Sequence, residues 1–472
     1  MIFKVIDIHG VRLYGIFCHA SKMQGIIGYW QHPGIGISAR LADFLYPHVE
    51  DLQDFEQFDA NRIGEDDNRY LPQPVWLLET PAHLRVKVRI VSLLKNSQAR
   101  SPPVTSISPV RISTGERLLS TVTTDDVYLF PSGMAALYRL HTYLNAANEN
   151  EYKSVAFGSL FQSTFDILQE YGAGLNIFPR GDEADLKKLE AFCKSEIQLL
   201  RKVQAVYVEF PSNPDLVSSD LTKLRTLADK YEFILVVDET IGSFANVDVF
   251  SVADVIATSL TKSFSGHSNV MAGSLVLNPE STAAYRKLKP LFRNNWHNEF
   301  FSGDAVALEY NSRDYMERMA ILNHNAEEVA AFLHTKATDP RSTVTKVNFP
   351  SVSATRRHFI SFIREGTPKF RPGYGCLLSV EFEEMEHTVA FYDALQMHCG
   401  PHLGAQLSIA LPYNKATYGR TPDGEAQAEA NGWTMKQIRI SVGLEDTKEL
   451  VATIQEAVAV ADALKHQGQG AM

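Results

Sequence analysis

The sequence predicts an α/β protein whose large domain carries a mostly parallel sheet, followed by a smaller α+β domain. Between about residues 120 and 280, short β-branched apolar runs alternate with longer helical patterns, which is typical of a doubly wound sheet. These runs show no polar alternation, as expected for strands covered on both faces. After about residue 340, strand and helix patterns return beyond a long helical stretch, which indicates a second domain.

The N-terminal arm or extension is expected to comprise residues 1–118. The segment HPGIGISAR at 32–40 is rich in turn residues, and PPVTSISP at 102–109 is rich in proline. The run RVKVRIVSLLKN at 85–96 favours a helix. We therefore expect an irregular arm that contains some helix.

The large domain is expected over residues 119–335. Helical patterns such as SGMAALYRLHTYL and LTKLRTLADKYE separate its apolar runs, so crossover helices join the strands. The stretch 303–335 predicts one long helix or two, at a position that suits a link between domains. The expected strands are DVYLF at 126–130, VQAVYVE at 203–209, FILVVDE at 233–239, DVIATS at 254–259 and MAGSLVL at 271–277.

The C-terminal small domain is expected over residues 336–472. CLLSVEFE at 376–383 and QIRISVG at 437–443 predict strands, and HTVAFYDALQMH at 387–398 predicts a helix. A further helix over 446–465 is expected to close the domain. Strands and helices of this kind predict a compact α+β unit.

The composition excludes several classes of partner. The net charge of −10 leaves no basic excess to neutralise phosphates, which argues against nucleic-acid and anionic-membrane surfaces. No apolar run is long enough to span a membrane, and the four cysteines are too scattered for a zinc site or a disulfide framework. We expect a cytoplasmic protein with no bound metal.

Lys262 lies in the Ser- and Gly-rich loop SLTKSFSGHSN, directly after the apolar run DVIAT. A lysine at the end of a buried strand can be shielded from water and lose its charge, as an amine that forms a Schiff base requires. The hydroxyls of Ser259 and Thr261, which flank the same turn, can bind phosphate oxygens. The simpler interpretation is a surface lysine that closes a strand.

Asp238 ends the run FILVVDE, 24 residues before Lys262. The carboxyl ends of parallel strands are where such sheets bind ligands, and a carboxylate there can keep a pyridine nitrogen protonated. Ser132, Gly133 and Met134 lie between a predicted strand and a predicted helix, where free N–H groups and the helix dipole form a phosphate cradle. The alternatives are an aspartate that caps a turn and an ordinary helix N-cap.

Two further positions suit an amino-acid ligand. Asn213 lies in the rigid loop EFPSNP after another strand, where its amide can donate to a ring hydroxyl, although the loop can equally be only a turn. Arg439 lies within the apolar strand QIRISVG and needs an anion, such as the carboxylate of an amino acid. An internal salt bridge would satisfy Arg439 equally well.

Taken together, these motifs resemble the Cys/Met-metabolism pyridoxal-phosphate enzymes, and most of all the fungal cystathionine γ-synthase branch. The resemblance covers about residues 120–460, and the motifs that carry it are SGM, PSNP, VVDET, SLTKSFSGHSNVMAG and RISVGLE in that order. It implies the aspartate-aminotransferase-like fold, known as fold-type I, and pyridoxal 5′-phosphate as the cofactor. It also implies homodimers or homotetramers with active sites at subunit interfaces.

The resemblance assigns roles to the residues already singled out. Lys262 would bind the cofactor and carry protons, Asp238 would pair with the pyridine nitrogen, and Arg439 would bind the substrate carboxylate. Ser132, Gly133, Met134, Ser259 and Thr261 would hold the phosphate, with Asn213 at the ring.

The sequence departs from the family pattern at two positions expected near the ligand, and the family's Tyr-x-Arg phosphate motif is not recognisable, since Arg69 and Tyr70 stand in the wrong order. Phe161 in FGSLFQST stands where relatives place a tyrosine that stacks on the cofactor ring, so stacking is kept but the hydroxyl is lost. His402 in His402-Leu403-Gly404 stands where relatives have a serine near the substrate carboxylate. Both changes put the usual pair of substrates in question.

The resemblance implies γ-replacement on an O-acyl-L-homoserine, with O-acetyl-L-homoserine as the expected substrate, through a vinylglycine-type electrophile. The second substrate is a nucleophile. Cysteine, which gives cystathionine, and a β-keto acid such as acetoacetate, which gives a C–C bond and a specialised non-proteinogenic amino acid or alkaloid, remain open. A γ-lyase comes third. The alternative of another class is a catalytically silent cofactor-binding protein, but such a protein is expected to have lost Lys262 or Asp238.

Overall fold

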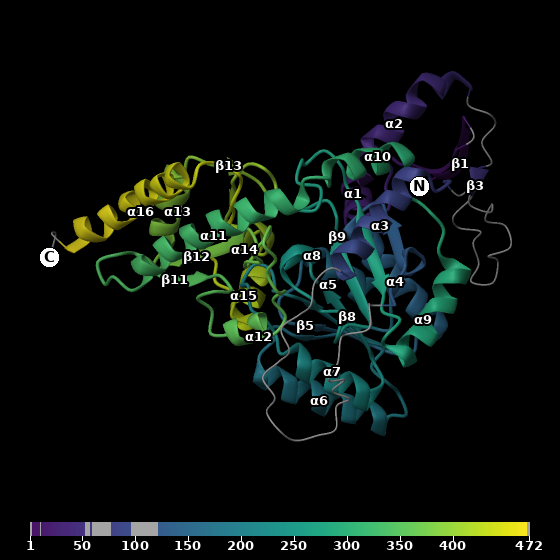
Figure 1. The fold of residues 1–472 in the computed structure, drawn as a ribbon, viewed down its shortest axis with the longest axis horizontal. Helices are drawn as coiled ribbons and strands as arrows, with labels where there is room; N and C mark the ends of the chain where they lie inside the picture. The colour runs from purple at the N-terminus through teal and green to yellow at the C-terminus, as the bar shows by residue number, and fades with distance from the viewer. Residues whose placement is uncertain (1, 10, 52–56, 59–76, 96–120, 470–472) are drawn as a thin grey trace.

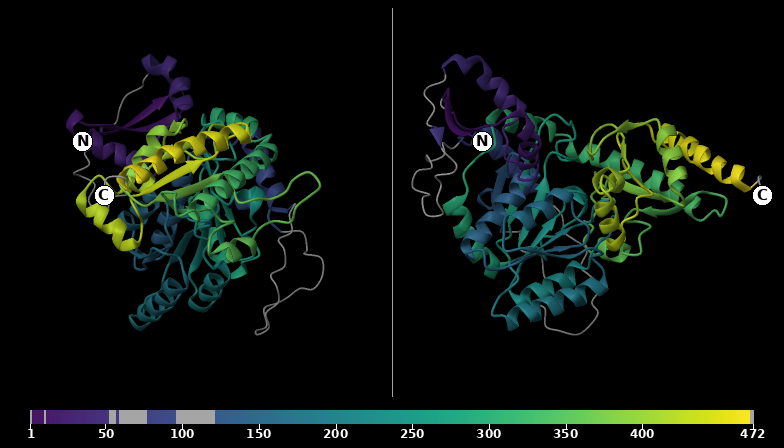
Figure 2. Two further views of the ribbon diagram at one scale, coloured as in Figure 1. Left: turned by 90° about the vertical axis from the view of Figure 1, so that its left-hand side faces the viewer. Right: turned by 180° about the vertical axis from the view of Figure 1, so that it is seen from behind.

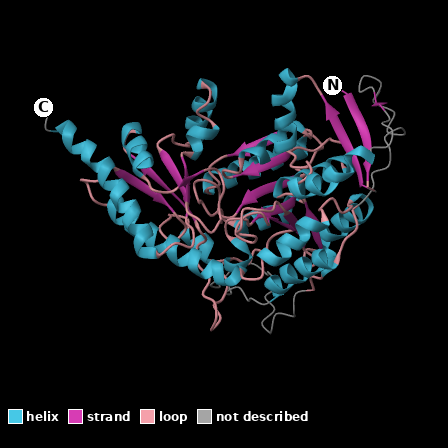
Figure 3. Cartoon of the chain, turned by 90° about the horizontal axis from the view of Figure 1, so that it is seen from above, coloured by secondary structure: helices cyan, strands magenta, loops and turns pink. Residues whose placement is uncertain are grey.

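The computed structural model describes residues 2–9, 11–51, 57–58, 77–95 and 121–469. Figure 1 shows a large domain beside a smaller C-terminal domain, with an N-terminal hairpin and its helices at the far end of the large domain. The two ends of the described chain, residues 2 and 469, lie at opposite ends of the molecule in the right-hand view of Figure 2 and in Figure 3.

A seven-stranded sheet forms the centre of the large domain, in the order β4-β10-β9-β8-β7-β5-β6. All of its neighbouring pairs are parallel except those of β10, which runs antiparallel to both β4 and β9. The apolar runs of the sequence become these strands because helices bury both faces. The bounds are β4 Val127–Phe130, β5 Ser154–Phe157, β6 Leu175–Phe178, β7 Ala205–Glu209, β8 Ile234–Asp238, β9 Val255–Ser259 and β10 Gly273–Leu277.

Helices on the two faces of this sheet enclose two apolar cores. Strand side chains alternate between them, so that Val206 and Val208 face one core while Ala205 and Tyr207 face the other. The helices of the large domain are α3 Pro81–Lys95, α4 Gly133–Ala147, α5 Gln162–Glu170, α6 Glu183–Gln198, α7 Leu221–Tyr231, α8 Ser243–Asn246 and α9 Thr282–Asn295.

The predicted helical stretch between the domains is two helices, α10 Ser302–Asn311 and α11 Tyr315–Ala337. Helix α11 belongs to both domains. Met319 and Leu322 in its first half pack in a core of the large domain, whereas Val329 and Leu333 in its second half pack in the core of the small domain. The helix is therefore a continuous connection between the two hydrophobic cores.

The small domain is built on a five-stranded sheet in the order β11-β12-β15-β14-β13. Its strands are β11 Val344–Asn348, β12 Leu377–Phe382, β13 His398–Cys399, β14 Ile409–Leu411 and β15 Gln437–Ser441. Its helices are α12 Arg356–Ile360, α13 Met385–Ala394, α14 Tyr413–Thr417, α15 Pro422–Asn431 and α16 Thr447–Gln469. The elements expected at 376–383, 387–398, 437–443 and 446–465 correspond to β12, α13, β15 and α16.

The N-terminal region is more regular than the sequence suggested. Strands β1 Ile2–Ile8 and β2 Val11–Phe17 form an antiparallel hairpin, and β3 Gln57–Phe58 pairs with β1. Helices α1 Met23–Gln31 and α2 Ala39–Leu45 follow the hairpin. The segment 102–109 lies outside the described residues. None of the helices in the described ranges combines the length and the apolar content needed to cross a bilayer.

Candidate active site

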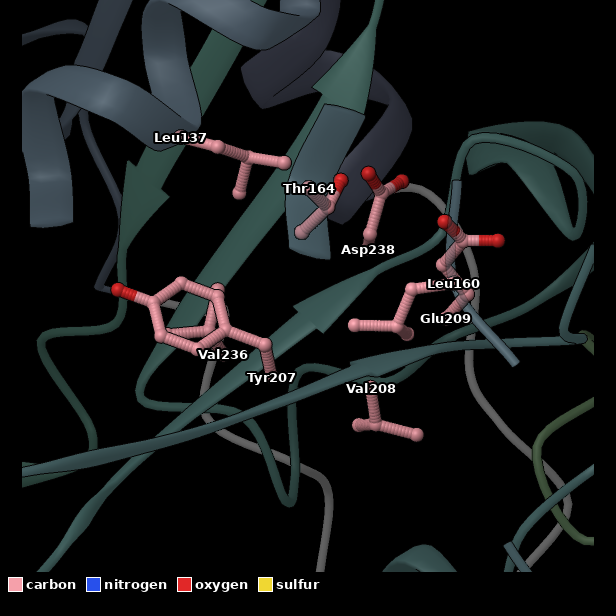
Figure 4. A pocket seen from close by; sticks show the side chains of 8 residues that line it. All are labelled: Leu137, Leu160, Thr164, Tyr207, Val208, Glu209, Val236 and Asp238. Carbon is pink, nitrogen blue, oxygen red and sulfur yellow. The ribbon is translucent and has the colours of Figure 1, made fainter. Parts of the chain in front are cut away.

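The carboxyl ends of the central strands β7, β8 and β9 meet at one edge of the large sheet. Their register aligns Glu209 of β7 with Asp238 of β8, and Asp238 with Ala257 of β9. A pocket opens here between the strands and the helices α4 and α5 (Figure 4). It is lined by Leu137, Leu160, Thr164, Tyr207, Val208, Glu209, Val236 and Asp238.

Two carboxyl groups lie at this strand edge, and Figure 4 shows them on the same side of the pocket. Burial raises the pKa of Asp238, and hydrogen bonds from Thr240, whose N–H lies 2.9 Å from Asp238 Oδ1, oppose the rise. Burial and then the charge of Asp238 raise the pKa of Glu209 well above its usual range. Glu209 Oε1 also accepts a hydrogen bond of 2.6 Å from the backbone of Phe161. A cation placed beside Asp238 would relieve this accumulation of negative charge.

Lys262 lies in the loop that follows β9, the strand that pairs with β8. Among the described residues its Nζ has neither a hydrogen-bond partner nor an ion-pair partner, although the side chain is partly buried. Burial, followed by the positive charge of Arg439, lowers the pKa of Lys262 to about 8. A substantial fraction of this amine is therefore neutral near physiological pH and able to act as a nucleophile or a base.

The predicted phosphate cradle lies at the start of α4. Ser132 is the N-cap: its hydroxyl accepts from the N–H of Ala135 at 2.9 Å and donates to the carbonyl of Gly34 at 2.9 Å. Gly133 permits the close approach of β9, because a Cβ there would lie 2.8 Å from Ser259 Cβ. The first N–H groups of a helix have no partners within the helix and remain available for an anion.

The remaining predicted phosphate ligands differ in whether their side chains already have hydrogen-bond partners in the protein. The Thr261 hydroxyl donates to the carbonyl of Ala272 at 3.2 Å and accepts from its N–H at 3.0 Å. Ser259 donates its N–H to the Thr240 hydroxyl at 2.8 Å, while no bond of its own hydroxyl is found among the described residues. Met134 lies beside Thr164, whose hydroxyl is 4.0 Å from its sulfur. Ser259 is therefore better placed than Thr261 to bind an anion through its hydroxyl.

Arg439 enters from β15 of the small domain and is only 3% exposed. Its guanidinium donates to Asn213 Oδ1 at 2.9 Å and to the carbonyl of Pro401 at 2.5 Å, and it lies 4.5 Å from the ring centre of Tyr413. Within the described part of the chain no carboxylate lies at ion-pair distance from it. Burial lowers its pKa. A buried guanidinium without a counter-ion suits the carboxylate of an incoming amino acid.

At the two positions where the sequence is expected to depart from the family pattern, the backbone of Phe161 contacts Glu209, and His402 feels the charges of Lys262 and Arg439. Phe161 is the N-cap residue of α5 and is 41% exposed. His402 precedes Gly404, and its Nε2 is buried with no hydrogen-bond partner in the described ranges. Burial and the charges of Lys262 and Arg439 lower the pKa of His402 to about 4. The imidazole is therefore neutral at physiological pH.

Three residues at the site escaped the sequence analysis as individual candidates. Tyr413 packs against Arg439, and burial raises the pKa of its phenol to about 12. Arg318 of α11 donates to the carbonyls of Ser263 at 2.8 Å and Phe264 at 3.1 Å, which fixes the loop of Lys262. Glu209 was seen only as the start of the EFPSNP loop. Its position at a strand end beside Asp238 was the one signal available in the sequence.

The donor set fits pyridoxal phosphate. Four features meet at this edge of the sheet: an amine with a lowered pKa, a buried carboxyl group, a helix N-terminus that only glycine fits, and a buried guanidinium. Neither the carboxyl group nor the guanidinium has an ion-pair partner among the described residues. These groups match the aldehyde, the pyridine nitrogen, the phosphate and the carboxylate of an attached amino acid.

Comparisons with known proteins agree with this chemistry. The sequence model of the family described as Cys/Met metabolism PLP-dependent enzymes matches residues 107–459. The cystathionine gamma-synthase-like enzyme iboG2 of Amanita muscaria is 38% identical over 362 residues, which are 74% of this chain and 57% of that protein. The alanine racemase ungC of Aspergillus violaceofuscus is 34% identical over 464 residues, 95% of this chain and 74% of the relative.

Among solved structures, cystathionine gamma synthase from Xanthomonas oryzae pv. oryzae in complex with aminoacrylate and cysteine superimposes with a TM-score of 0.58. The match covers 82% of this chain and 100% of that chain, at 21% sequence identity. This likeness confirms the predicted fold: a fold-type I large domain with a mostly parallel sheet and a smaller C-terminal domain.

Proposed function

Because the chain belongs to the family of Cys/Met metabolism PLP-dependent enzymes, we propose that it catalyses γ-replacement on an O-acylated L-homoserine, with O-acetyl-L-homoserine as the expected ester. Its cofactor is pyridoxal phosphate, and it is a cystathionine gamma-synthase-like enzyme. The second substrate supplies the nucleophile. The single observation that carries the proposal is that the buried guanidinium of Arg439 has no anion, and the nearby amine of Lys262 no partner, within the described ranges of the chain.

When bound, pyridoxal phosphate withdraws electrons from an attached amino acid and so acidifies its C–H bonds. Asp238 would hold a proton at the pyridine nitrogen, which strengthens that withdrawal. Arg439, oriented by Asn213 and Pro401, would hold the substrate carboxylate and thereby direct the α-C–H bond. Lys262 would remove the proton from Cα and then from Cβ, which prepares the γ-carbon to lose its acyl group.

The side chain of Phe161 favours an ester as the substrate. A thiolate or alkoxide leaving group needs a proton from a nearby acid, and a phenylalanine carries none. A carboxylate such as acetate leaves as a stable anion and needs no proton. The replacement of a phenol by Phe161 therefore supports esters of homoserine over thioethers, and replacement over γ-lysis of cystathionine.

Two nucleophiles remain candidates, a thiol such as cysteine and the carbon of a β-keto acid. The changes at Phe161 and His402 alter the pocket relative to enzymes that use cysteine, and this supports a carbon nucleophile of a specialised pathway. Either nucleophile must give up one proton as it attacks.

A second candidate function is amino-acid racemisation, because the protein that aligns with 95% of this chain is named an alanine racemase. Its first step would be the same: Lys262 removes the α-proton from an amino acid whose carboxylate lies on Arg439. The two functions differ only afterwards, since a racemase returns the proton to the opposite side of Cα and breaks no C–O bond.

One set of reactions tests these proposals. Purified protein loaded with cofactor is incubated with O-acetyl-L-homoserine alone, with cysteine added, or with acetoacetate added, and acetate and product masses are measured. L-alanine in deuterated water is run in parallel and analysed by chiral chromatography. Acetate release with a coupled product supports γ-replacement, and the product mass identifies the nucleophile.

Two other outcomes would support the alternative functions. Formation of D-alanine without acetate release would replace the first proposal by the racemase. Neither reaction, together with no cofactor absorbance, would mean that the chain is a silent member of its family.

We also propose that the protein is a homo-oligomer, at least a dimer. Exposed apolar side chains gather on the neighbouring helices α3 and α10: Leu84, Val88, Val306 and Tyr310 are all more than half exposed. Monomeric proteins rarely expose such an apolar cluster to solvent, and contact with a second copy of the chain would bury it.

A further inference from the structure

The loop that carries His402 is fixed from two sides. On one side, the carbonyl of Pro401 accepts from Arg439 Nη2 at 2.5 Å, and the N–H of Gly404 donates to the Ser441 hydroxyl at 2.9 Å. On the other side, Gly404 has a φ of +73°, and a Cβ there would lie 2.4 Å from the backbone nitrogen of Ser263. His402 is therefore held between Arg439 of β15 and the loop of Lys262.

Among the residues that the structure describes, no hydrogen-bond partner of His402 Nε2 explains the position of the imidazole. Its Nε2 is buried and makes no hydrogen bond in the described part of the chain, a costly state for a ring nitrogen. The charged groups that face it are Lys262 from the loop after β9 and Arg439 from β15; Glu209 and Tyr413 lie beyond, around Arg439. A nitrogen left unpaired in this way, within reach of the charges of Lys262 and Arg439, indicates a ligand or a proton as its partner.

We propose that His402 is the second proton-carrying residue of this site, and that it accepts the proton of the incoming nucleophile once a substrate carboxylate has occupied Arg439. This inference rests on the proposed γ-replacement. His402 thus compensates for the hydroxyl that Phe161 lacks, from a different element of the fold.

The electrostatics of the site explain why binding of the substrate would activate His402. Burial, Lys262 and Arg439 together hold the pKa of His402 at about 4, too low for an effective base. The substrate carboxylate cancels the charge of Arg439, and a Lys262 that is to remove a proton begins as the neutral amine. The effects of the two positive charges are then reduced and only the effect of burial remains, so the pKa of His402 rises toward the range of a useful base.

The proton balance of the step is complete. The C–O bond of the ester breaks, and the carboxylate leaves with the electron pair. The nucleophile, a thiol or an acidic C–H compound, forms its bond to Cγ with the electron pair of its S–H or C–H bond. The proton passes to His402 Nε2 and then to solvent, which accounts for the one acid released in each turnover. No oxidant or further reactant is needed.

The direct test measures the pKa of His402 in the cofactor-loaded protein by NMR of ¹⁵N-labelled histidine. The His402→Gln variant identifies the resonance. Titrations are run without ligand and with saturating 2-aminoisobutyrate, an amino acid that has a carboxylate for Arg439 but no α-proton to lose. We expect the pKa to rise by at least about one unit with the ligand, because its carboxylate neutralises Arg439. An unchanged or lower value overturns the proposal.

The kinetic test separates the two halves of the reaction. In His402→Gln, the rate of coupling to the nucleophile should fall about 100-fold, the lower end of general-base effects, and by a clearly larger factor than the rate of acetate release from O-acetyl-L-homoserine alone. His398→Gln, at an exposed position of β13, is the matched control and should change neither rate. Equal loss of both rates would make His402 a structural residue and overturn the proposal.

Failure of the proposed function has a different signature. If the parent protein releases no acetate at all, γ-replacement is wrong, while the titration with 2-aminoisobutyrate still reports whether an occupied Arg439 changes the ionisation of His402.

Discussion

At the scale of single residues, the site is defined by groups that lack a partner. Lys262 has no anion, Arg439 has no carboxylate and His402 Nε2 has no hydrogen bond among the described residues. Each of these states costs free energy in a folded chain, and together they mark the place where a cofactor and a substrate complete the structure.

The amine of Lys262 should capture pyridoxal phosphate with an apparent pKa near 8. The measurement is the rate at which apoprotein forms a borohydride-fixed adduct on the peptide that contains position 262, followed by mass spectrometry over pH 6–11. Because the folded pKa lies below the unfolded value near 10.5, the unfolded chain binds more protons between pH 8 and 10.5. The contribution of Lys262 to stability therefore rises with pH across that window.

The exposed Lys369→Ala variant should leave this capture unchanged, and Lys262→Ala should abolish it. An adduct that forms at another lysine, or a capture pKa near 10.5, would contradict the assignment.

Replacement of Arg439 by lysine should weaken substrate binding more than it slows the chemistry. Lysine keeps the charge but loses the planar fork that pairs with a carboxylate. The loss of one charged hydrogen bond, about 1.5–3 kcal/mol, corresponds to an increase in KM of about 10- to 150-fold. Steady-state kinetics measure it, with Arg341→Lys on the surface as control. An unchanged KM would show that the substrate carboxylate binds elsewhere.

The sequence indicated Lys262, Asp238 and Arg439 because their positions at strand ends or inside an apolar strand are visible in a local pattern. Tyr413 and Arg318 were not visible. Arg318 reaches a loop 54 and 55 residues earlier in the chain, and Tyr413 packs against a strand that follows a separate helix. Contacts of this kind depend on tertiary packing and leave no periodic signal.

At the scale of elements, the strands of the large sheet were predictable and the N-terminal hairpin was not. Strands β4, β7, β8, β9 and β10 are buried on both faces, so each is an apolar run bounded by turns. In the hairpin of β1 and β2, Ile8 packs with Leu41 and Leu45 of α2. Lys4 and Asp7 interrupt the apolar residues of β1, so the sequence shows no continuous apolar run there.

The turn after α1 connects the N-terminal region to the predicted phosphate cradle. The carbonyl of Gly34 accepts from the Ser132 hydroxyl, and the glycine adopts a φ of +65°. A Cβ at this position would lie 2.3 Å from Ser132 Oγ, so only glycine permits the contact.

Gly34→Ala should therefore loosen the N-terminal region. Backbone strain of this type costs about 1–3 kcal/mol, which should appear as faster amide hydrogen exchange in α1 and α2. Gly28→Ala is the matched control within α1, since a Cβ there meets nothing within 4 Å and alanine favours a helix. Equal exchange in the two variants would mean that the Gly34 contact does not hold the region in place.

At the scale of the whole molecule, the exposed apolar cluster on α3 and α10 predicts self-association. Val88→Asp combined with Val306→Asp, at positions 52% and 57% exposed, should convert the oligomer to monomers, because a buried unpaired carboxylate opposes association. Sedimentation velocity measures the change. Val460→Asp, 48% exposed on α16, should leave the oligomer intact. A parent protein that sediments as a monomer would contradict the prediction.

Helix α11 has a consequence for how such a site can change over time. Through Arg318 its first half holds the loop of Lys262, and its second half supports the small-domain sheet that carries Arg439. One continuous helix thus links the loop that carries the amine to the sheet that carries the guanidinium. Position 402 lies outside this helix, so a substitution there leaves the link intact. The side chains around the site can therefore change while this connection stays the same.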